Sequence, residues 1–404
     1  MKRWLLIVLY VSACLGVRGQ YLHLAGDTTR TGLWLDLDKV WNYNLYEHTR
    51  WGGGLLLTTH PQRFLFSRLD VGAYVGYGTF DEQWKYGFGL DEHLRGSRCA
   101  TVLYQRARHD YTAAGSRRLA NPWEESQLLG SFMTQRMVAE NSVTLGVRWQ
   151  LGPWQPAVEL TWGKRAWLFD GSRLIYAREA VTHRSTLARL RLVLRHSGGF
   201  GSQLDLIGNA QRAEGETTWA PLAARLLADY SHSFDLTPVR LDLYAQGGLS
   251  TREVEYADMF DLGGTWGVPL LVTNSLLTVR PNELAANTFL LLRLKLKSEN
   301  PLYSIYSPLL NLGSNPSPFV AATAVWGQLW GQDAQGQVEW LDSHLQAPHR
   351  GLLEPTLGVD GLVRWGAVDW GAAVTYRLTP PSAPYHLTGL HQNLTLLITG
   401  ILIL

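Results

Sequence analysis

The chain has 404 residues, a formal net charge of +2 and only 17% charged residues, whereas a typical soluble domain has about 25%. The near-zero net charge excludes the strongly basic balance of nucleic-acid-binding proteins, so we predict no nucleic-acid partner. Glycine reaches 40 residues, and tryptophan and tyrosine reach 17 each. Aromatic residues at two interfaces and glycines at strand bends are typical of membrane β-barrels, which use such a length as one domain.

The first residues have the pattern of an export signal. Lys2 and Arg3 precede the apolar run 4–15, and small or modest side chains stand just before Gln20. The sequence therefore predicts a signal peptide over residues 1–19 and a single barrel domain over residues 20–404. The alternative is a lipoprotein cleavage box at 11–14, which would leave a lipidated Cys14. If Cys14 is removed, Cys99 is the single remaining cysteine, so we expect no internal disulfide.

Residues 64–94 alternate clearly between apolar and polar side chains and have the pattern of a β-hairpin. In its second arm the apolar residues Trp84, Tyr86, Phe88 and Leu90 are separated by polar residues or glycines. Because successive side chains point to opposite faces of a strand, each arm has one apolar face and one polar or open face. The apolar face must therefore contact either a protein core or lipid.

The same two-residue period recurs as far as the C-terminus, and a helical period is nowhere sustained. We identify roughly 14–16 strand candidates, many of them close to the 9–11 residues that a tilted membrane strand requires. The irregular stretches 112–126, 251–285, 300–317 and 331–350 are predicted to be loops. No stretch is a convincing run of about 20 apolar residues, so we predict no helical membrane span.

A soluble β-sandwich or propeller is the alternative to a membrane barrel, because its strands also alternate. Arg189, Arg191 and Arg195 share one predicted polar face, and such a row suits a solvated sheet and a water-filled lumen equally. The polar faces are, however, rich in glycine and tyrosine and poor in lysine. With the export signal and the apolar final strand, this favours an all-β fold. We predict a transmembrane antiparallel β-barrel of roughly 14–16 strands in the cell outer membrane, in contact with outer-membrane lipid.

Four segments resemble a known family. Residues 43–50, YNLYEHTR, are similar to the YN-x-x-E-G-x-R segment that opens the barrel in a Bacteroidota outer-membrane family of unknown function, although His48 replaces the usual glycine. Residues 72–87 resemble that family's GYxGYG…D-x-x-(W/F)-K-Y-G hairpin, and residues 260–264 and 354–360 echo its later segments.

In that family a carboxypeptidase-like regulatory domain often precedes the barrel, and the layout of the barrel is similar to that of surface-antigen barrels of the outer-membrane assembly and secretion class. The resemblance implies an outer-membrane barrel and no particular activity. Because the segment between the signal and the first predicted strand is short, we expect no regulatory or periplasmic domain there. A chaperone-like insertion role, which uses such domains, is therefore not expected.

Residues with catalytic chemistry are sparsely placed. His183 lies near Ser185, and His232 lies near Asp229, but spacing alone gives neither pair a nucleophile–base geometry. No G-x-S-x-G elbow is present, and the twelve histidines have no metal-ligand spacing. We therefore predict no enzyme activity, no cofactor and no metal. The alternative is an outer-membrane hydrolase with its site at the rim.

Charged residues on the predicted polar faces form the candidate functional set. Within a lumen they would either pair with one another and plug the interior, or line an anion-favouring passage, because charged rings set pore selectivity. The sequence predicts a non-enzymatic passage or an accessory in surface protein or lipid handling, with other envelope proteins as candidate partners. The alternative is a plugged structural barrel with loop-mediated binding. The candidate lumen charges are Glu47, Arg50, Glu159, Arg189, Arg191, Arg195, Arg225, Asp229, Arg240, Asp242, Arg293 and Lys295. The candidate lipid-facing aromatics are Tyr77, Trp84, Tyr86, Phe88, Trp149 and Trp162.

Overall fold

The computed structural model is an all-β protein in the part of the chain that it describes. The described residues are 21–27, 30–36, 41–44, 48–60, 66–79, 82–94, 98–110, 137–167, 183–196, 201–251, 260–262, 276, 278, 284–307, 312–332, 338–340, 352–365, 368–378 and 394–402. The predicted signal peptide and the predicted loop 112–126 lie outside them. Among these residues, no helix is long and apolar enough to cross a membrane.

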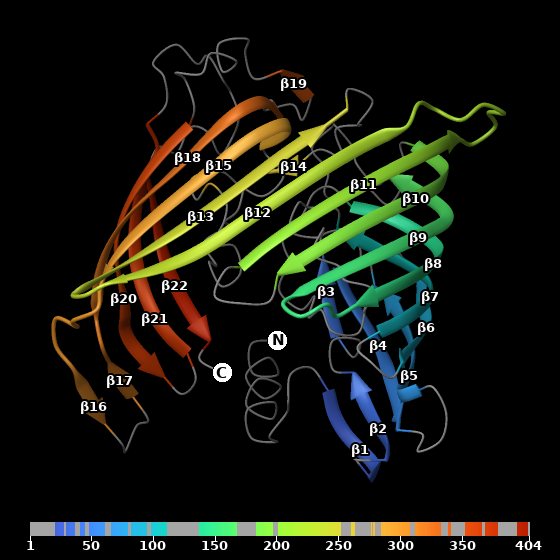
Figure 1. Ribbon diagram of the computed structural model, residues 1–404, viewed down its shortest axis with the longest axis horizontal. Coiled ribbons are helices and arrows are strands. Elements are labelled where there is room, and N and C mark those ends of the chain that lie inside the picture. Colours follow the sequence, from blue (N-terminus) through green and yellow to red (C-terminus); the bar gives the residue numbers. More distant parts are fainter. Residues whose placement is uncertain are drawn as a thin grey trace.

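The strands account for nearly all of the described chain (Figure 1). In chain order they are β1 (Tyr21–Asp27), β2 (Thr31–Asp36), β3 (Trp41–Asn44), β4 (His48–Thr59), β5 (Phe66–Gly78), β6 (Trp84–Leu94), β7 (Arg98–Asp110), β8 (Met137–Trp149), β9 (Trp154–Trp167), β10 (His183–His196), β11 (Gly201–Ala213), β12 (Ala223–Leu236), β13 (Val239–Ser250), β14 (Phe260–Asp261), β15 (Leu284–Ser298), β16 (Ile305–Ser307), β17 (Leu312–Ser314), β18 (Ser317–Gln332), β19 (Val338–Trp340), β20 (Leu352–Trp365), β21 (Val368–Tyr376) and β22 (Leu394–Leu402).

The long strands form one antiparallel ladder in which each strand pairs with the next one along the chain. β2 and β3 pair with consecutive stretches of the same edge of β4, so together they occupy one position. Sixteen positions then run from β2/β3 through β4–β13, β15, β18, β20 and β21 to β22, and β1 adds a short strand beside β2. The prediction of roughly 14–16 strands is confirmed.

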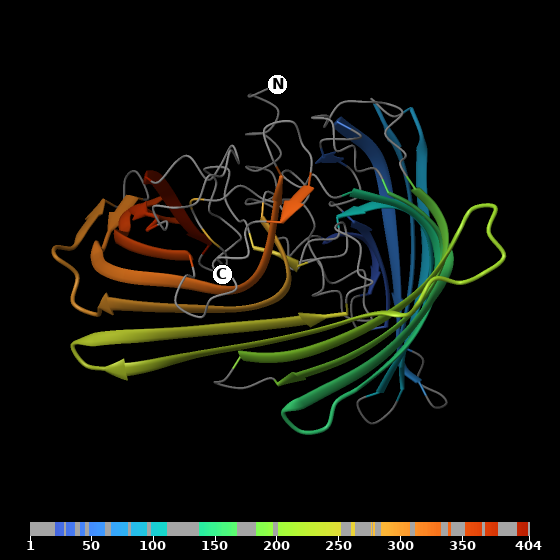
Figure 2. The same cartoon turned by 90° about the horizontal axis from the view of Figure 1, so that it is seen from above.

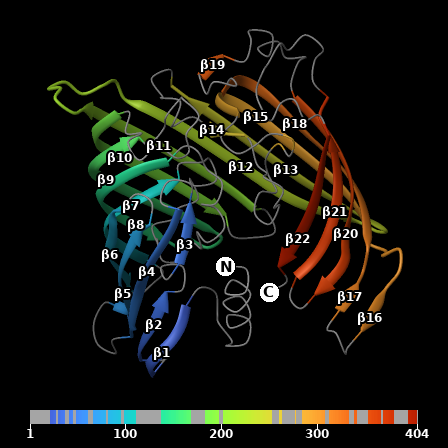
Figure 3. The same ribbon diagram turned by 180° about the vertical axis from the view of Figure 1, so that it is seen from behind.

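The first and last strands of the ladder stand on facing sides of the interior. In Figures 1 and 3, β2–β4 lie across from β20–β22. Within the described residues, the pairing ends at β1 on one side and at β22 on the other, and no register joins these two strands. The strands between them curve around the interior, as Figure 2 shows from above. The sheet therefore has a concave inner face and a convex outer face.

The convex face is apolar, whereas the concave face carries the buried charged residues together with some apolar ones. On β9, Leu160 and Trp162 are 53% and 56% exposed, whereas Glu159 and Thr161 beside them are buried. The same alternation leaves leucine and valine side chains exposed on β8, β10, β11, β15, β18, β20, β21 and β22. A soluble protein buries such side chains and rarely exposes a large continuous apolar patch. A sheet with this inverted pattern is stable where its outer face contacts lipid.

The hairpin predicted over residues 64–94 is formed by β5 and β6. Their register sets Asp70 opposite Asp91. Trp84 and Phe88 are exposed on the convex face, whereas Asp70, Lys85 and Asp91 are buried on the concave face. Because side chains alternate along a strand, this burial fixes the direction of every other residue in the hairpin.

Aromatic side chains mark both ends of the apolar band. Trp51, Tyr77 and Trp84 form one row across β4, β5 and β6. Trp154 and Trp162 lie near opposite ends of β9 on its convex side. Their separation of eight residues corresponds to about 26 Å along the strand, or roughly 20 Å along the membrane normal at the usual tilt. This height suits the apolar band of a membrane barrel with its two aromatic girdles.

The two ends of the sheet differ in the length of their connections. At one end, the turns 60–65, 95–97, 150–153, 197–200, 237–238 and 366–367 have two to six residues each, and one longer connection, 299–316, contains β16 and β17. At the other end are the shorter connections 79–83 and 214–222 and the long connections 111–136, 168–182, 251–283, 333–351 and 377–393. We call these the short-turn end and the long-loop end. Outer-membrane barrels have short periplasmic turns and longer extracellular loops, so the long-loop end corresponds to the extracellular side of such a barrel.

Three of the predicted loops contain strands. β14 lies within 251–285, the hairpin of β16 and β17 lies within 300–317, and β19 lies within 331–350. The prediction of continuous loops was therefore wrong at these places. The strands have only two or three residues each, which is too few for a two-residue period to appear in the sequence.

Candidate functional site

The concave face of β8–β10 places the predicted basic row beside carboxylates. Arg189 lies 3.7 Å from Glu140 of β8, and Arg191 lies 3.5 Å from Glu159 of β9. Nε of Arg189 also donates a hydrogen bond to Oδ1 of Asn209 on β11, at 3.1 Å. Both guanidinium groups therefore have carboxylate partners on nearby strands. This arrangement favours interior ion pairing over a free basic ring at these two arginines.

The other predicted charges of β10 and β12 lie on the same face. The register sets Arg195 between Gln155 and Gln203, in the inward-facing series of β10. Arg225 is buried on β12, and Asp229 follows it at the spacing of one face. These residues extend the polar concave face from β9 to β12.

Basic residues of β15 converge on one carboxylate of β20. Nζ of Lys295 is 2.7 Å from Oδ2 of Asp360, and Nζ of Lys297 is 3.1 Å from the same oxygen. The ammonium group of Lys295 also lies 4.0 Å from the ring centroid of Phe319, within the range of a cation–π contact. Arg293 continues this series one residue pair closer to the long-loop end, opposite Thr323.

The remaining predicted charges lie near the rims or outside the described part. Arg240 and Asp242 pair at 2.9 Å close to the short-turn end, where both side chains are partly exposed. Arg50 stands opposite Gly78 in the register of β4 and β5, but its side chain is not among those described. Glu47 lies outside the described residues.

The six predicted lipid-facing aromatics occupy convex positions. Each shares the direction of the exposed apolar residues on its strand, and Trp84, Phe88 and Trp162 are the most exposed of them. They comprise Tyr77 on β5, Trp84, Tyr86 and Phe88 on β6, Trp149 on β8 and Trp162 on β9.

Two pieces of the connection between β13 and β15 pack onto the concave face. We call residues 260–262, Leu276 and Thr278 the inner segment. Its strand β14 pairs with β15, with Phe260 opposite Ala286. The N–H of Leu276 donates a hydrogen bond to the carbonyl oxygen of Leu262 at 3.0 Å, so the two pieces are joined to each other.

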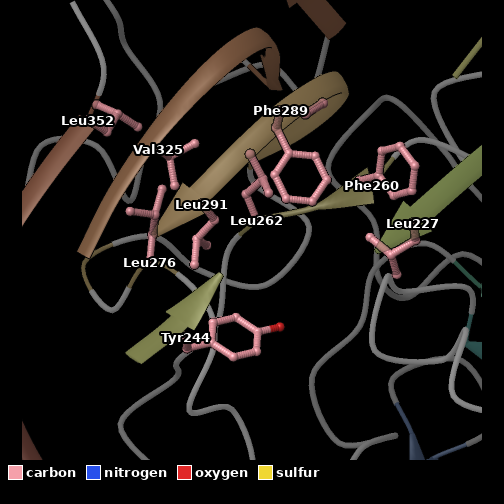
Figure 4. Packing of buried hydrophobic residues seen from close by; sticks show 10 residues of the cluster. Leu227, Tyr244, Phe260, Leu262, Leu276, Phe289, Leu291, Val325 and Leu352 are labelled. Carbon is pink, nitrogen blue, oxygen red and sulfur yellow. The ribbon is translucent and has the colours of Figure 1, made fainter. Parts of the chain in front are cut away.

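The inner segment completes an apolar cluster (Figure 4). Phe260, Leu262 and Leu276 are buried there with side chains from five strands of the sheet. The rings of Phe260 and Phe289 have centroids 5.2 Å apart, and the guanidinium carbon of Arg225 lies 5.9 Å from the Phe260 ring. The side chains from the sheet are Leu227, Tyr244, Ala286, Phe289, Leu291, Val325 and Leu352. At the level of this cluster, packed apolar side chains therefore cover the concave face from β12 to β20.

A buried polar contact holds the inner segment to β20. The backbone N–H of Thr278 donates a hydrogen bond to Oε1 of Glu354 at 3.1 Å, and the Thr278 hydroxyl donates to the same oxygen. Nη1 of Arg377 donates to that hydroxyl at 3.4 Å. Glu354 and Arg377 are fully buried. Because a buried carboxylate needs hydrogen-bond partners, these contacts tie the inner segment to the wall; we call the three residues the latch.

Gly248 on β13 makes room for the aromatic pair in this cluster. A β-carbon at this position would overlap the rings of Phe289 and Phe260. We expect Gly248→Ala to destabilise the folded chain by about 1–3 kcal/mol, because the rings must move within a packed cluster. Urea unfolding of the reconstituted chain would measure the change. Gly53→Ala is the control, since nothing lies within 4 Å of that added β-carbon; equal unfolding midpoints for the two variants would contradict the prediction.

The pair Asp229 and His232 does not form a catalytic dyad. The two side chains leave β12 on opposite faces, because they are three residues apart on a strand. His232 packs on the convex side against Phe234, with ring centroids 4.3 Å apart. The side chain of His183 lies outside the described part. Among the described residues, no three His, Cys, Asp or Glu side chains are grouped as a metal ion would require.

Several buried charges of the concave face are not among the predicted lumen charges. Glu140, Arg165, Glu354, Asp360 and Arg377 are all buried. A signal for two of them was present in the alternation of residues 353–360, where Glu354 and Asp360 fall in the series opposite to the exposed leucines. That series was noted only for its family resemblance.

The apolar convex band, the aromatic rows at its ends and the polar or plugged concave face together define a transmembrane antiparallel β-barrel. No family model and no curated protein matches this chain.

Solved structures with a similar course of the chain are outer-membrane β-barrel proteins. CdiB from Escherichia coli is 13% identical, with a TM-score of 0.44 over 92% of this chain and 62% of that one. BamA from Haemophilus ducreyi lacking POTRA domains 1–3 is 9% identical, with a TM-score of 0.46 over 98% and 76%. The siderophore receptor PirA from Acinetobacter baumannii is 8% identical, with a TM-score of 0.35 over 89% and 61%. This chain thus spans about three fifths of the CdiB and PirA chains.

Proposed function

We propose that this protein is a non-enzymatic outer-membrane β-barrel that assists the handling of surface protein or lipid, and that its lumen is closed at rest by the inner segment. The observation that carries this proposal is the latch, in which Thr278 of the inner segment is bound to Glu354 of the wall. The inner segment is held by these polar contacts, by its share of the apolar cluster and by the pairing of β14 with β15, and a segment of this size can open locally without unfolding of the strands around it. Other envelope proteins are the partners that such an accessory would serve.

A structural barrel with loop-mediated binding is the second candidate. It is favoured by the paired charges on the concave face, since Arg189 and Arg191 each have a carboxylate partner. In this case the interior would remain closed, and the long connections at the long-loop end would carry the binding. The two candidates differ in whether release of the inner segment opens a path.

Planar-bilayer recording of the purified full chain tests the resting state. We expect a conductance well below that of an open 16-stranded porin recorded in parallel, because porins of that size leave an aqueous channel and the inner segment packs against part of the concave face here. A steady porin-like conductance would contradict a lumen closed at rest. Hydrolysis of lipid or peptide substrates that is lost in His183→Ala or His232→Ala would instead overturn the non-enzymatic assignment.

The outer-membrane location has an independent test. A membrane barrel keeps its fold in detergent without heating, so we expect unheated and heated samples to migrate differently on a gel. A chain that stays in solution without detergent would contradict this location. The resemblance of residues 43–50 and 72–87 to the Bacteroidota family supports the same location and adds no activity to it.

A further inference from the structure

A row of polar and basic side chains crosses the convex face near the long-loop end. The register sets Asn141, Lys164, Thr186 and Arg212 side by side on β8, β9, β10 and β11. All four have the direction of the exposed apolar residues on their strands, so their side chains leave the sheet on its outer side. We call these four residues the outer row.

The outer row marks an abrupt end of the apolar band. The two neighbouring convex rows toward the short-turn end carry only apolar side chains or glycine. Two residues along a strand span about 6.6 Å, so the change from apolar to polar takes place within that distance. In a membrane barrel this is the level at which hydrocarbon gives way to lipid headgroups. The two apolar rows are Val143, Trp162, Ala188 and Ala210, followed by Leu145, Leu160, Leu190 and Gly208.

The connection 214–222 folds back over this level and adds an aromatic ring. The ring of Trp219 lies 5.7 Å from that of Trp162 on β9 and 5.5 Å from the guanidinium carbon of Arg212 on β11. On β10, between β9 and β11, the residue beside Trp162 is Ala188. Its small side chain leaves space on the convex side of the sheet. Trp219 therefore contacts both Trp162 and the guanidinium group of Arg212, and indole rings favour the membrane interface.

The two basic groups of the outer row are available for an anion. Within the described part of the chain, neither Lys164 nor Arg212 contacts a carboxylate. The carboxylate of Glu214 lies 3.7 Å from Arg184, one row further out, and Glu216 follows in the same turn. The outer row itself offers an ammonium, a guanidinium, an amide and a hydroxyl, all of which donate hydrogen bonds. At the usual strand spacing these donors extend over about 14 Å.

We propose that the outer row binds the phosphate-bearing headgroup of an anionic membrane lipid in the leaflet at the long-loop end. Lys164 and Arg212 would pair with phosphate oxygens, and the acyl chains would lie on the apolar rows below. A cation pair above an apolar band fits an amphipathic lipid better than a free anion, because only the lipid contacts both surfaces. This inference rests on the proposed outer-membrane location.

Tryptophan quenching by brominated lipids tests the proposal on the full chain. The chain is reconstituted in phosphatidylcholine vesicles that contain brominated phosphatidylglycerol or, in parallel, brominated phosphatidylcholine. In the native chain, we expect brominated phosphatidylglycerol to quench the tryptophan fluorescence more strongly than brominated phosphatidylcholine does. The preference should fall about fivefold for Lys164→Gln or Arg212→Gln and about 25-fold for the double variant, because each interfacial cation contributes about 1 kcal/mol. Trp219→Phe identifies the part of the signal that arises at this site.

The double variant Arg240→Gln with Arg364→Gln is the matched control. It removes the same charge at the short-turn end, where Arg240 pairs with Asp242 and Arg364 with Asp369, and it should leave the preference unchanged. Equal loss in both double variants would overturn the site, as would displacement of the lipid by millimolar inorganic phosphate, which would indicate a free-anion site. No lipid preference in a chain that is inserted and heat-modifiable overturns the site alone. Failure to insert overturns the proposed location and the site with it.

Discussion

Replacing Glu354 with alanine should release the inner segment and raise the conductance of the barrel in planar bilayers. Glu354 is the acceptor for both the N–H and the hydroxyl of Thr278, so its loss leaves these two buried donors without their carboxylate. Each buried donor that is left without an acceptor costs about 1–3 kcal/mol. This cost destabilises the contact between the inner segment and β20. We therefore expect a less stable fold together with openings that the native chain lacks.

Two further variants separate release of the inner segment from general loss of stability. Glu354→Gln keeps an acceptor oxygen for Thr278 and should have a smaller effect on conductance. Thr356→Val removes a buried hydrogen bond, 2.9 Å long, between the hydroxyls of Thr356 on β20 and Thr375 on β21. Thr356 lies on the same strand as Glu354 and is not one of the latch residues. It should lower the stability by about 1 kcal/mol without openings. If Glu354→Ala inserts normally and never conducts, the passage is refuted and the structural barrel is the better proposal.

The strands of this fold could be predicted because their signal is local. On β9 and β10 the outward apolar series and the inward polar series differ residue by residue, so Leu160 and Arg191 reveal their directions without knowledge of any partner. The direction of a side chain is set by its own strand. The partner of an inward charge is set by the register between strands. The local alternation of a strand does not predict this register.

The closure of the interior could not be predicted for the same reason. The contact between Thr278 and Glu354 joins residues 76 positions apart. The segments 260–264 and 354–360 had each been noted for family resemblance, yet nothing in either segment indicates that the connection between β13 and β15 turns inward and meets β20. An exposed loop and a connection that packs inside a barrel both lack a regular two-residue period in the sequence. Only the packing of Phe260 and Leu262 on the concave face distinguishes them.

The convex band gives the second large prediction, which is that Leu160→Arg should strongly destabilise the chain in a bilayer. Leu160 lies on β9 between the two tryptophans that mark the ends of the band, and its side chain is 53% exposed. On the lipid face of a membrane barrel an arginine costs about 2–4 kcal/mol at the bilayer midplane and less toward the interfaces, so we expect a cost between these limits at Leu160, which lies two residues inside Trp162. The same change on a water-exposed surface is usually within about 0.5 kcal/mol. Reversible urea unfolding in phosphatidylcholine vesicles, followed by tryptophan fluorescence, measures this difference.

Leu236→Arg is the matched control for this measurement. Leu236 is also 53% exposed, but it ends β12 beside the turn 237–238 at the short-turn end. An arginine at the rim can reach the headgroups and water, so we expect a cost of about 0–1 kcal/mol. The two variants make the same chemical change at the same exposure and differ only in depth. Because a soluble protein would tolerate both changes equally, unchanged unfolding midpoints for both variants would contradict a lipid-facing convex band.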